Sequence, residues 1–227
     1  MGAALAAIHC SIMSKISTSL SEGIDHLVYA CANLERGMDE IEQLLGVRPV
    51  PGGRHPDFGT HNALLSLGPE TYLEVIARDP DSTVSVPSAL AELPDDQNSR
   101  LKTWVLRTED IDQLAGIANA AGINIGPVQS GSRDAPDGSK ISWQLTDHNA
   151  MPMGGAIPFL INWGDTPHPA SLVPNGGELL NLLIEHPEAE RVRDMLVVLG
   201  MDLEVKHGPD FKLVASVRTI NGIRILE

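Results

Sequence analysis

Apolar residues recur along the chain in two alternating rhythms, short strand-like runs and stretches with helical spacing. Strand-like runs begin at Ile24, Leu101 and Glu178. After each run, apolar residues recur at steps of three and four, which predicts one apolar face of a helix. In the first such stretch these residues are Leu34, Met38, Ile41, Leu44 and Leu45.

Each predicted helix stops at a glycine, namely Gly46, Gly122 or Gly200. Glycine suits the left-handed turn that ends many helices. A short strand follows each glycine, and two longer strand-like runs close each unit: "HNALLSLG" and "TYLEVIA", "KISWQLT" and "AIPFLIN", "FKLVASVR" and "GIRILE". The order β-α-β-β-β therefore occurs three times, which predicts an α+β fold made of repeated βαβββ modules.

The repeat also predicts how the chain is divided. Turn-rich segments separate the units, and the small residues and Ser/Thr at the start read as a leader outside the fold, with Met1 or Met13 as the first residue. The predicted division is a leader at 1–22, a first module at 23–79, a linker at 80–100, a second module at 101–170 and a third, shortened module at 178–227.

Composition narrows the partners that we expect. The formal net charge of −14 argues against nucleic acid or an anionic membrane, because both attract clustered Lys and Arg. No apolar run approaches the roughly 20 residues that span a bilayer. The two cysteines, Cys10 and Cys31, form no disulfide or zinc pattern, so we expect a cytoplasmic protein.

Three stretches of the chain carry a resemblance to a known family. The first unit reads "GIDHLVYACANLERGMDEIEQLLGVRPVPGGRHPDFGTHNALLSLGPETYLEVIA", the second closes on "PFLINWGDTPHP", and the third contains "HPEAERVRDMLVVLGMDLEV". The chain thereby resembles the glyoxalase-like domain family of the vicinal oxygen chelate superfamily, from Ile24 to Leu226. This resemblance implies paired modules whose mixed sheets curl around a concave site that holds a divalent metal ion.

The resemblance also implies metal ligands, a His on the first strand and a Glu on the last strand of a module. Here those positions are His26 and Glu74. Imidazole and carboxylate can bind Zn, Fe, Mn or Ni and leave positions open for a substrate with two adjacent oxygens. Aligning the units puts Thr103 and Leu160 at the corresponding positions of the second unit, and Leu180 opposite His26 in the third. The usual two-sided site is therefore incomplete.

His61 is the candidate that would complete the site from within the first unit. A two-residue turn between the last two strands would pair Leu65 with Glu74, and His61 would then share a face with Glu74 because alternate strand residues share a face. His26, His61 and Glu74 would form a facial two-histidine, one-carboxylate trio. A shift of that turn by one residue would turn His61 away.

Four further residues are candidates for substrate contact. Asn62 stands beside His61 on the same predicted strand, and Trp143 and Trp163 lie on neighbouring strands where they could line an apolar pocket. His168 lies between two prolines after the second unit's last strand. Ordinary core packing remains the alternative for the tryptophans, and a rigid loop role for His168.

Two main functions follow as hypotheses. The first is a metal-dependent enzyme, of lyase, isomerase or dioxygenase type, that acts on a small oxygen-chelating substrate, with Glu74 or a metal-bound water as the base. The alternative is a protein of the same fold that binds and sequesters a small molecule without a metal, which Thr103 and Leu160 favour. A third reading is an interaction module whose sheets serve a homodimer.

Overall fold

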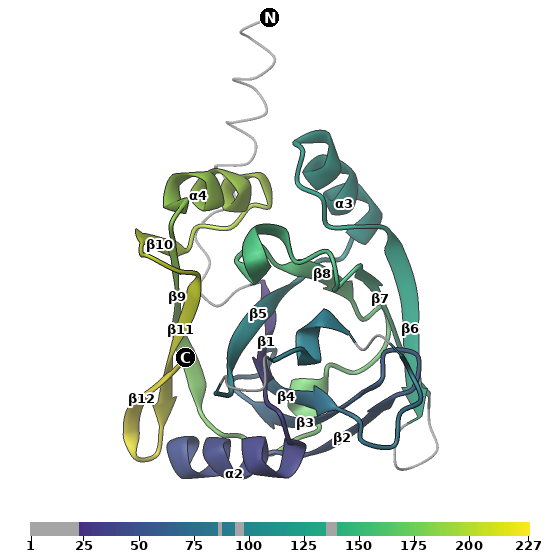
Figure 1. Cartoon of the computed structure of the whole chain (residues 1–227), viewed down its shortest axis with the longest axis vertical. Helices are drawn as coiled ribbons and strands as arrows, with labels where there is room; N and C mark the ends of the chain where they lie inside the picture. The colour runs from purple at the N-terminus through teal and green to yellow at the C-terminus, as the bar shows by residue number, and fades with distance from the viewer. Residues whose placement is uncertain (1–22, 86–87, 94–97, 135–139) are drawn as a thin grey trace, which may run out of the picture.

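The computed structural model describes residues 23–85, 88–93, 98–134 and 140–227 (Figure 1). The predicted leader, residues 1–22, lies outside the described residues. The first unit comprises β1 (Ile24–Ala30), α2 (Leu34–Leu45), β2 (Val50–His55), β3 (Thr60–Ser66) and β4 (Tyr72–Arg78). The second comprises β5 (Arg100–Arg107), α3 (Ile111–Ala120), β6 (Val128–Asp134), β7 (Lys140–Thr146) and β8 (Phe159–Asn162). The third comprises β9 (Glu178–His186), α4 (Ala189–Val198), β10 (Glu204–His207), β11 (Lys212–Thr219) and β12 (Gly222–Leu226).

The helices form where the sequence pattern predicts them. The side chain of Asn33 accepts a hydrogen bond from the backbone N–H of Arg36 and caps the start of α2. The helix ends at Gly46, whose φ of 85° is a conformation that glycine adopts without strain. Its apolar face is buried, as the three- and four-residue spacing predicts. Short 3₁₀ turns occur at η1 (Ala89–Ala91), η2 (Pro152–Gly155) and η3 (Pro169–Ser171).

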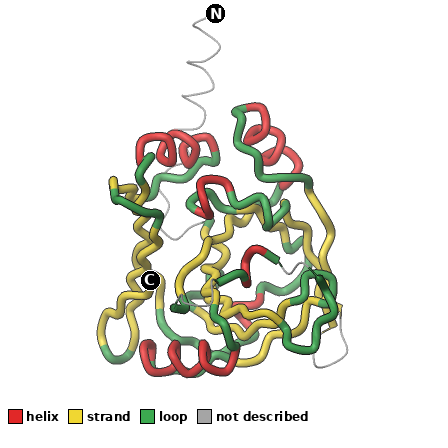
Figure 2. The backbone as a smooth tube through the Cα atoms, in the orientation of Figure 1, coloured by secondary structure: helices red, strands yellow, loops and turns green. Residues whose placement is uncertain are grey.

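The first two units share one eight-stranded sheet, with the strand order β2-β3-β4-β1-β5-β8-β7-β6. β1 and β5 are antiparallel to each other at the centre, while β4 runs parallel to β1 and β8 runs parallel to β5. The sheet curls so far that its two edge strands, β2 and β6, come into contact. Figure 2 shows the helices outside this curl and short helical turns inside it. The expected α+β fold of repeated βαβββ modules is confirmed.

The third unit has the expected element order but a different strand order. Its strands form a separate four-stranded sheet, β10-β9-β11-β12, in which β9 lies between β10 and β11. In the first unit, by contrast, β1 pairs with β4 and with β5 of the second unit. Leu180 of β9 is therefore not the spatial counterpart of His26. The third unit does not build a second copy of the concave site.

The two faces of the curled sheet have separate cores. Leu27, Trp104 and Leu160 belong to the larger core, which also includes residues of the helices and of the third unit. Val28, Val105 and Phe159 belong to the smaller core on the concave side. No helix within the described ranges has both the length and the apolar character that crossing a membrane requires.

Register corrects one alignment between the first two units. Val28 pairs with Glu74 across β1 and β4, and Val105 pairs with Phe159 across β5 and β8. Phe159, rather than the expected Leu160, is therefore the counterpart of Glu74. Both residues are apolar, so the second unit supplies no carboxylate at this position.

Candidate functional site

A pocket opens on the concave face of the curled sheet. About 650 Å³ of space lies between its lining atoms, a figure that includes open solvent at its mouth. Most of its wall is apolar, with Phe58, Leu90, Leu145 and Ile161 among the lining residues. The imidazole and carboxylate groups in the wall are those of His26, His55, Glu74 and His148.

A β-bulge on β1 brings two adjacent side chains together. Neighbouring residues of a regular strand point to opposite faces. Between Ile24 and His26, however, the register with β5 advances by two residues on β1 and only one on β5. Such a bulge re-aims side chains locally. It explains how Asp25 Oδ1 can lie 2.6 Å from Nδ1 of the neighbouring His26.

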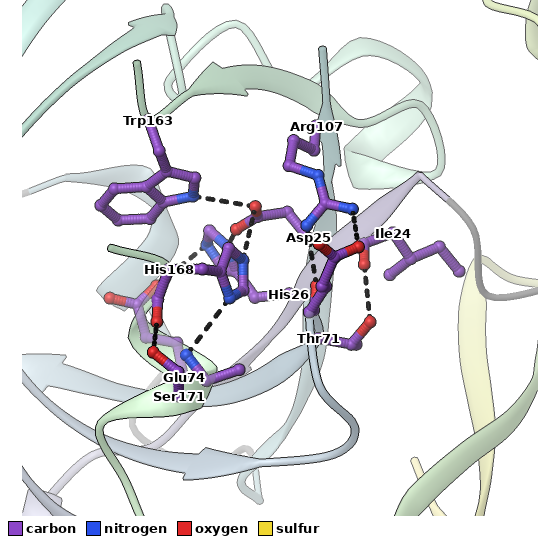
Figure 3. Close-up of polar contacts among 11 residues, drawn as sticks. Ile24, Asp25, His26, Thr71, Glu74, Arg107, Trp163, His168 and Ser171 are labelled. Carbon is purple, nitrogen blue, oxygen red and sulfur yellow. Dashed lines mark hydrogen bonds and ion pairs between the residues drawn. The ribbon is translucent and has the colours of Figure 1, made fainter. Parts of the chain in front are cut away.

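Asp25 is the centre of a buried hydrogen-bond cluster (Figure 3). Its side chain is fully buried. Oδ2 accepts a hydrogen bond from Nε1 of Trp163 at 2.9 Å and one from Nε2 of His168 at 3.0 Å. Nδ1 of His168 accepts from the backbone N–H of Ala170, so the proton of this ring lies on Nε2. The cluster ties β1 to the segment that follows β8.

The cluster keeps Asp25 ionised. Burial alone would raise the pKa of this carboxyl, but the hydrogen bonds and charges of His168 and His26 outweigh burial and hold the pKa below its ordinary value. An ionised carboxylate only accepts hydrogen bonds, so Nδ1 of His26 must carry a proton. Nε2 is then the nitrogen of His26 that remains for the pocket.

Glu74 faces His26 from the neighbouring strand. Its side chain is almost buried, and Oε2 lies 3.7 Å from Nε2 of His26, which is too long for a direct hydrogen bond. Oε1 accepts a hydrogen bond of 2.6 Å from Nδ2 of Asn62 on β3. The imidazole of His26 stacks on the ring of Tyr72, with centroids 4.4 Å apart. Both reactive groups are thus held in place by neighbours.

The expected position of His61 is wrong by one residue. Glu74 pairs with Leu64 rather than with Leu65, and His61 pairs with Ala77. Alternate residues of β3 share a face, so Asn62 and Leu64 line the pocket while His61 lies on the opposite face of the sheet. A turn shifted by one residue is sufficient to cause this reversal.

The donors present do not build the expected three-ligand metal site. Within the described part of the chain, no three His, Cys, Asp or Glu side chains gather closely enough to hold an ion. His26 and Glu74 offer two donors, whereas catalytic zinc sites use three protein ligands. Asp25 is occupied by His26, Trp163 and His168.

The structure places the four predicted substrate-contact residues in two groups. Asn62, Trp143 and Trp163 line the pocket, and the two indole rings are 5.7 Å apart. His168 is not among the lining residues, and its ring bonds to Asp25. It therefore supports the site through Asp25. Substrate contact by any of the four stays a prediction.

Sequence reasoning missed two titratable residues of the site, Asp25 and His148. Asp25 stands next to His26, and an adjacent strand residue is expected on the other face unless a bulge intervenes. His148 follows β7 in a turn and lines the pocket, although nothing in the motif "TDHN" signals it. The expected linker contributes too, since Ser88 and Leu90 line the pocket.

Comparison with known proteins adds a family and a fold. A model of the glyoxalase-like domain matches residues 24–200. No curated protein matches the chain. A hypothetical protein from Staphylococcus aureus has a similar structure, with a TM-score of 0.64 and 15% identity over 90% of this chain and 98% of its own.

Two methylmalonyl-CoA epimerases match a smaller part of the chain. The enzyme from Mycobacterium tuberculosis has 22% identity and a TM-score of 0.43, over 66% of this chain and 93% of its own. The enzyme from Streptomyces coelicolor has 17% identity and a TM-score of 0.41, over 64% of this chain and 96% of its own. At these identities the likeness concerns the fold alone.

Proposed function

The chain belongs to the glyoxalase-like domain family, and from this premise we propose that it is an enzyme of isomerase or lyase type that moves a proton on a small, partly apolar substrate. One observation carries the proposal. Asp25 fixes the proton of His26 on Nδ1, and Nε2 faces Glu74 at 3.7 Å inside a buried pocket. A positioned base with an orienting carboxylate is the arrangement that proton transfer requires.

The roles of the three side chains follow from this arrangement. Nε2 of His26 removes a proton from a C–H bond next to a carbonyl group. The electron pair of that bond forms a C=C bond, and the π pair of the carbonyl group moves to its oxygen, which gives an enolate. The imidazolium that forms is stabilised by the carboxylate of Glu74, since a negative charge at this distance favours the charged form. Asp25 holds the ring through Nδ1. Return of the proton to another carbon gives an isomer, and loss of a leaving group gives the product of a lyase.

A second candidate keeps the predicted divalent ion. Ligands about 2.1 Å from one ion lie at most roughly 4.2 Å apart, so Nε2 of His26 and Oε2 of Glu74, 3.7 Å apart, could both bind it. Water or substrate oxygens would complete the coordination of Zn, Fe, Mn or Ni. Such an ion would supply Lewis-acid polarisation of a carbonyl oxygen.

Exchange with deuterium tests the proposal and separates the two candidates. The protein is treated with chelator and incubated in D2O with a panel of 2-oxo acids, 2-hydroxyketones and 1,3-diketones, and loss of the C–H signals is followed by proton NMR. The proposal predicts that at least one compound exchanges faster than in buffer alone, and that His26→Gln gives only the rate of buffer alone. Exchange that appears only when a divalent ion is restored favours the second candidate.

Failure of exchange under both conditions contradicts enzymatic proton transfer. Binding of a panel compound that persists in chelator would then favour the sequestering protein, and binding is read from a rise in melting temperature. The exposed His207→Gln serves as the matched control, because its side chain is outside the pocket. It should retain the exchange activity of the wild type.

A further inference from the structure

We propose that His148 is a second anchor of the pocket, where it forms a hydrogen bond with a neutral oxygen function, a hydroxyl or a carbonyl, on an otherwise apolar part of the substrate. This inference rests on the proposed function, because it assigns a ligand to the same pocket. It names a recognition group that lies outside the Asp25, His26 and Glu74 arrangement.

His148 carries an unsatisfied polar atom. His148 is only 4% exposed, and its Nε2 is buried with no hydrogen-bond partner among the residues that the structure describes. Nearly all buried polar atoms in folded proteins have a partner. His148 lines the pocket, so a small turn of its ring as a ligand enters would give Nε2 the partner that the described residues do not supply.

Neighbouring residues hold the segment around His148 in place. The backbone N–H of Asn149 donates to Oδ1 of Asp147, and Oδ1 of Asn149 accepts from the backbone N–H of Ala89 beside η1. The ring of His148 lies edge-on to that of Phe58, with centroids 4.5 Å apart. These contacts restrain the segment that carries the ring, which lowers the entropic cost of binding a ligand there.

The charge state of His148 indicates the chemical class of its partner. Burial lowers the pKa of His148, so the ring is neutral near pH 7. A neutral imidazole offers one N–H and one lone pair, and a hydroxyl group can satisfy Nε2 in either tautomer because it both donates and accepts. The carboxylate of Glu74 lines the same pocket and disfavours an anionic ligand there.

The surroundings of the two anchors define the rest of the ligand. The ring of Phe159 lies 6.1 Å from that of His26 and 6.3 Å from that of His148. Leu90 and Leu145 add apolar wall. The ligand that fits is therefore an apolar, ring-sized body along Phe159, with its reactive carbonyl at His26 and a second, neutral oxygen at His148.

Two ketones that differ by one hydroxyl group test this assignment. Acetophenone and 4-hydroxyacetophenone are titrated into the full chain, and binding is followed by the fluorescence of Trp143 and Trp163, which line the pocket. We expect the wild type to bind the hydroxyl compound about 10-fold more tightly, a typical effect of one well-made polar contact. His148→Phe should bind both ketones equally.

Further variants guard against misfolding and separate the two proposals. His148→Gln keeps a hydrogen-bonding side chain and should retain part of the preference, and the exposed His207→Phe should retain all of it. His26→Gln should retain the preference even though it loses deuterium exchange, so failure of the proposed function leaves this test intact. Equal binding of the ketones by the wild type, no binding of either, or an unchanged preference in His148→Phe overturns the assignment.

Discussion

Oδ1 of Asp25 lies 2.6 Å from Nδ1 of His26, the residue next to it on β1. This contact exists because a bulge interrupts the alternation of side chains along the strand. It fixes the tautomer of His26, and the same carboxylate also accepts hydrogen bonds from Trp163 and His168. One buried side chain thus stabilises the fold and prepares the base.

Replacing Asp25 should therefore affect stability and activity together. Asp25→Asn loses charge-assisted hydrogen bonds, and its amide group places a donor among three donors. We expect the free energy of unfolding to fall by about 2–3 kcal/mol, measured by urea denaturation. Deuterium exchange should fall, but less than in His26→Gln, because the base itself remains.

A conservative surface change provides the control for this variant. Glu70 bonds Arg107 at 2.8 Å, but its side chain is 67% exposed. Glu70→Gln should cost less than about 0.5 kcal/mol, as exposed ion pairs do. Equal losses in the two variants would contradict the central role of Asp25.

His148→Phe should stabilise the protein in the absence of ligand. The substitution removes a buried nitrogen without a described partner, and relief of this cost should add about 1 kcal/mol to the free energy of unfolding. The measurement is a urea titration beside His207→Phe. A loss of stability in His148→Phe alone would show that the nitrogen has a partner within the fold.

The effect of His148→Phe on the free energy of unfolding should depend on pH. Burial lowers the pKa of His148, and His55 lowers it further, while Asp147 and Glu74 oppose these effects. Below the ordinary histidine pKa of about 6.5, His148 is protonated in the unfolded chain but remains neutral in the folded protein until its lowered pKa is reached. The free energy of unfolding of the wild type therefore falls as the pH falls from about 6.5 toward that lowered pKa. His148→Phe should lack this part of the loss. Its advantage over the wild type should therefore be larger at about pH 5.5 than at about pH 7.5.

Adjacent residues of β3 should behave in opposite ways. His61 lies on the face away from the pocket, so His61→Gln should keep ketone and divalent-ion binding within about twofold of the wild type. Asn62→Leu should change both, because it removes the hydrogen bond that holds Glu74. Isothermal titration of both variants with the ketone and with a divalent ion tests the register between β3 and β4. Loss of ion binding in His61→Gln would restore the arrangement first expected from the sequence.

Gly131→Ala should displace a wall of the pocket. A Cβ at Gly131 on β6 would overlap the indole of Trp143 on the paired strand, so this ring must move. We expect a change in tryptophan emission and roughly 5-fold weaker ketone binding, a loss of about 1 kcal/mol. Gly116→Ala on α3 is the control, since its Cβ would meet no atom within 4 Å. An unchanged emission spectrum in Gly131→Ala would contradict the position of the Trp143 ring against Gly131.

The sequence predicts the elements of this fold because their signals are local. Apolar spacing and a helix-ending glycine determine α2 whatever its neighbours do. Strand order depends on which distant segments meet, and for this reason the position of β9 between β10 and β11 could not be read from the element order. The same limit applies to the partner of Glu74, where one residue of register decides which side His61 takes.

The site was predictable only where strand position alone sets a side chain's direction. His26 and Glu74 meet as the resemblance implied, with Nε2 and Oε2 3.7 Å apart. Asp25 required a bulge, which leaves no mark in the sequence "GIDHLVYA". His148 reaches the pocket from a turn of the second unit, and only the curl of the shared sheet brings it there.

The position of the proton on His26 is the most direct test of this account. Nitrogen-15 NMR of histidine-labelled protein, assigned with His26→Gln and recorded at a pH where the ring is neutral, distinguishes a protonated ring nitrogen from one with a lone pair. We expect a proton on Nδ1, bonded to Asp25, and a lone pair on Nε2 toward Glu74. A proton on Nε2 with a bare Nδ1 would contradict it.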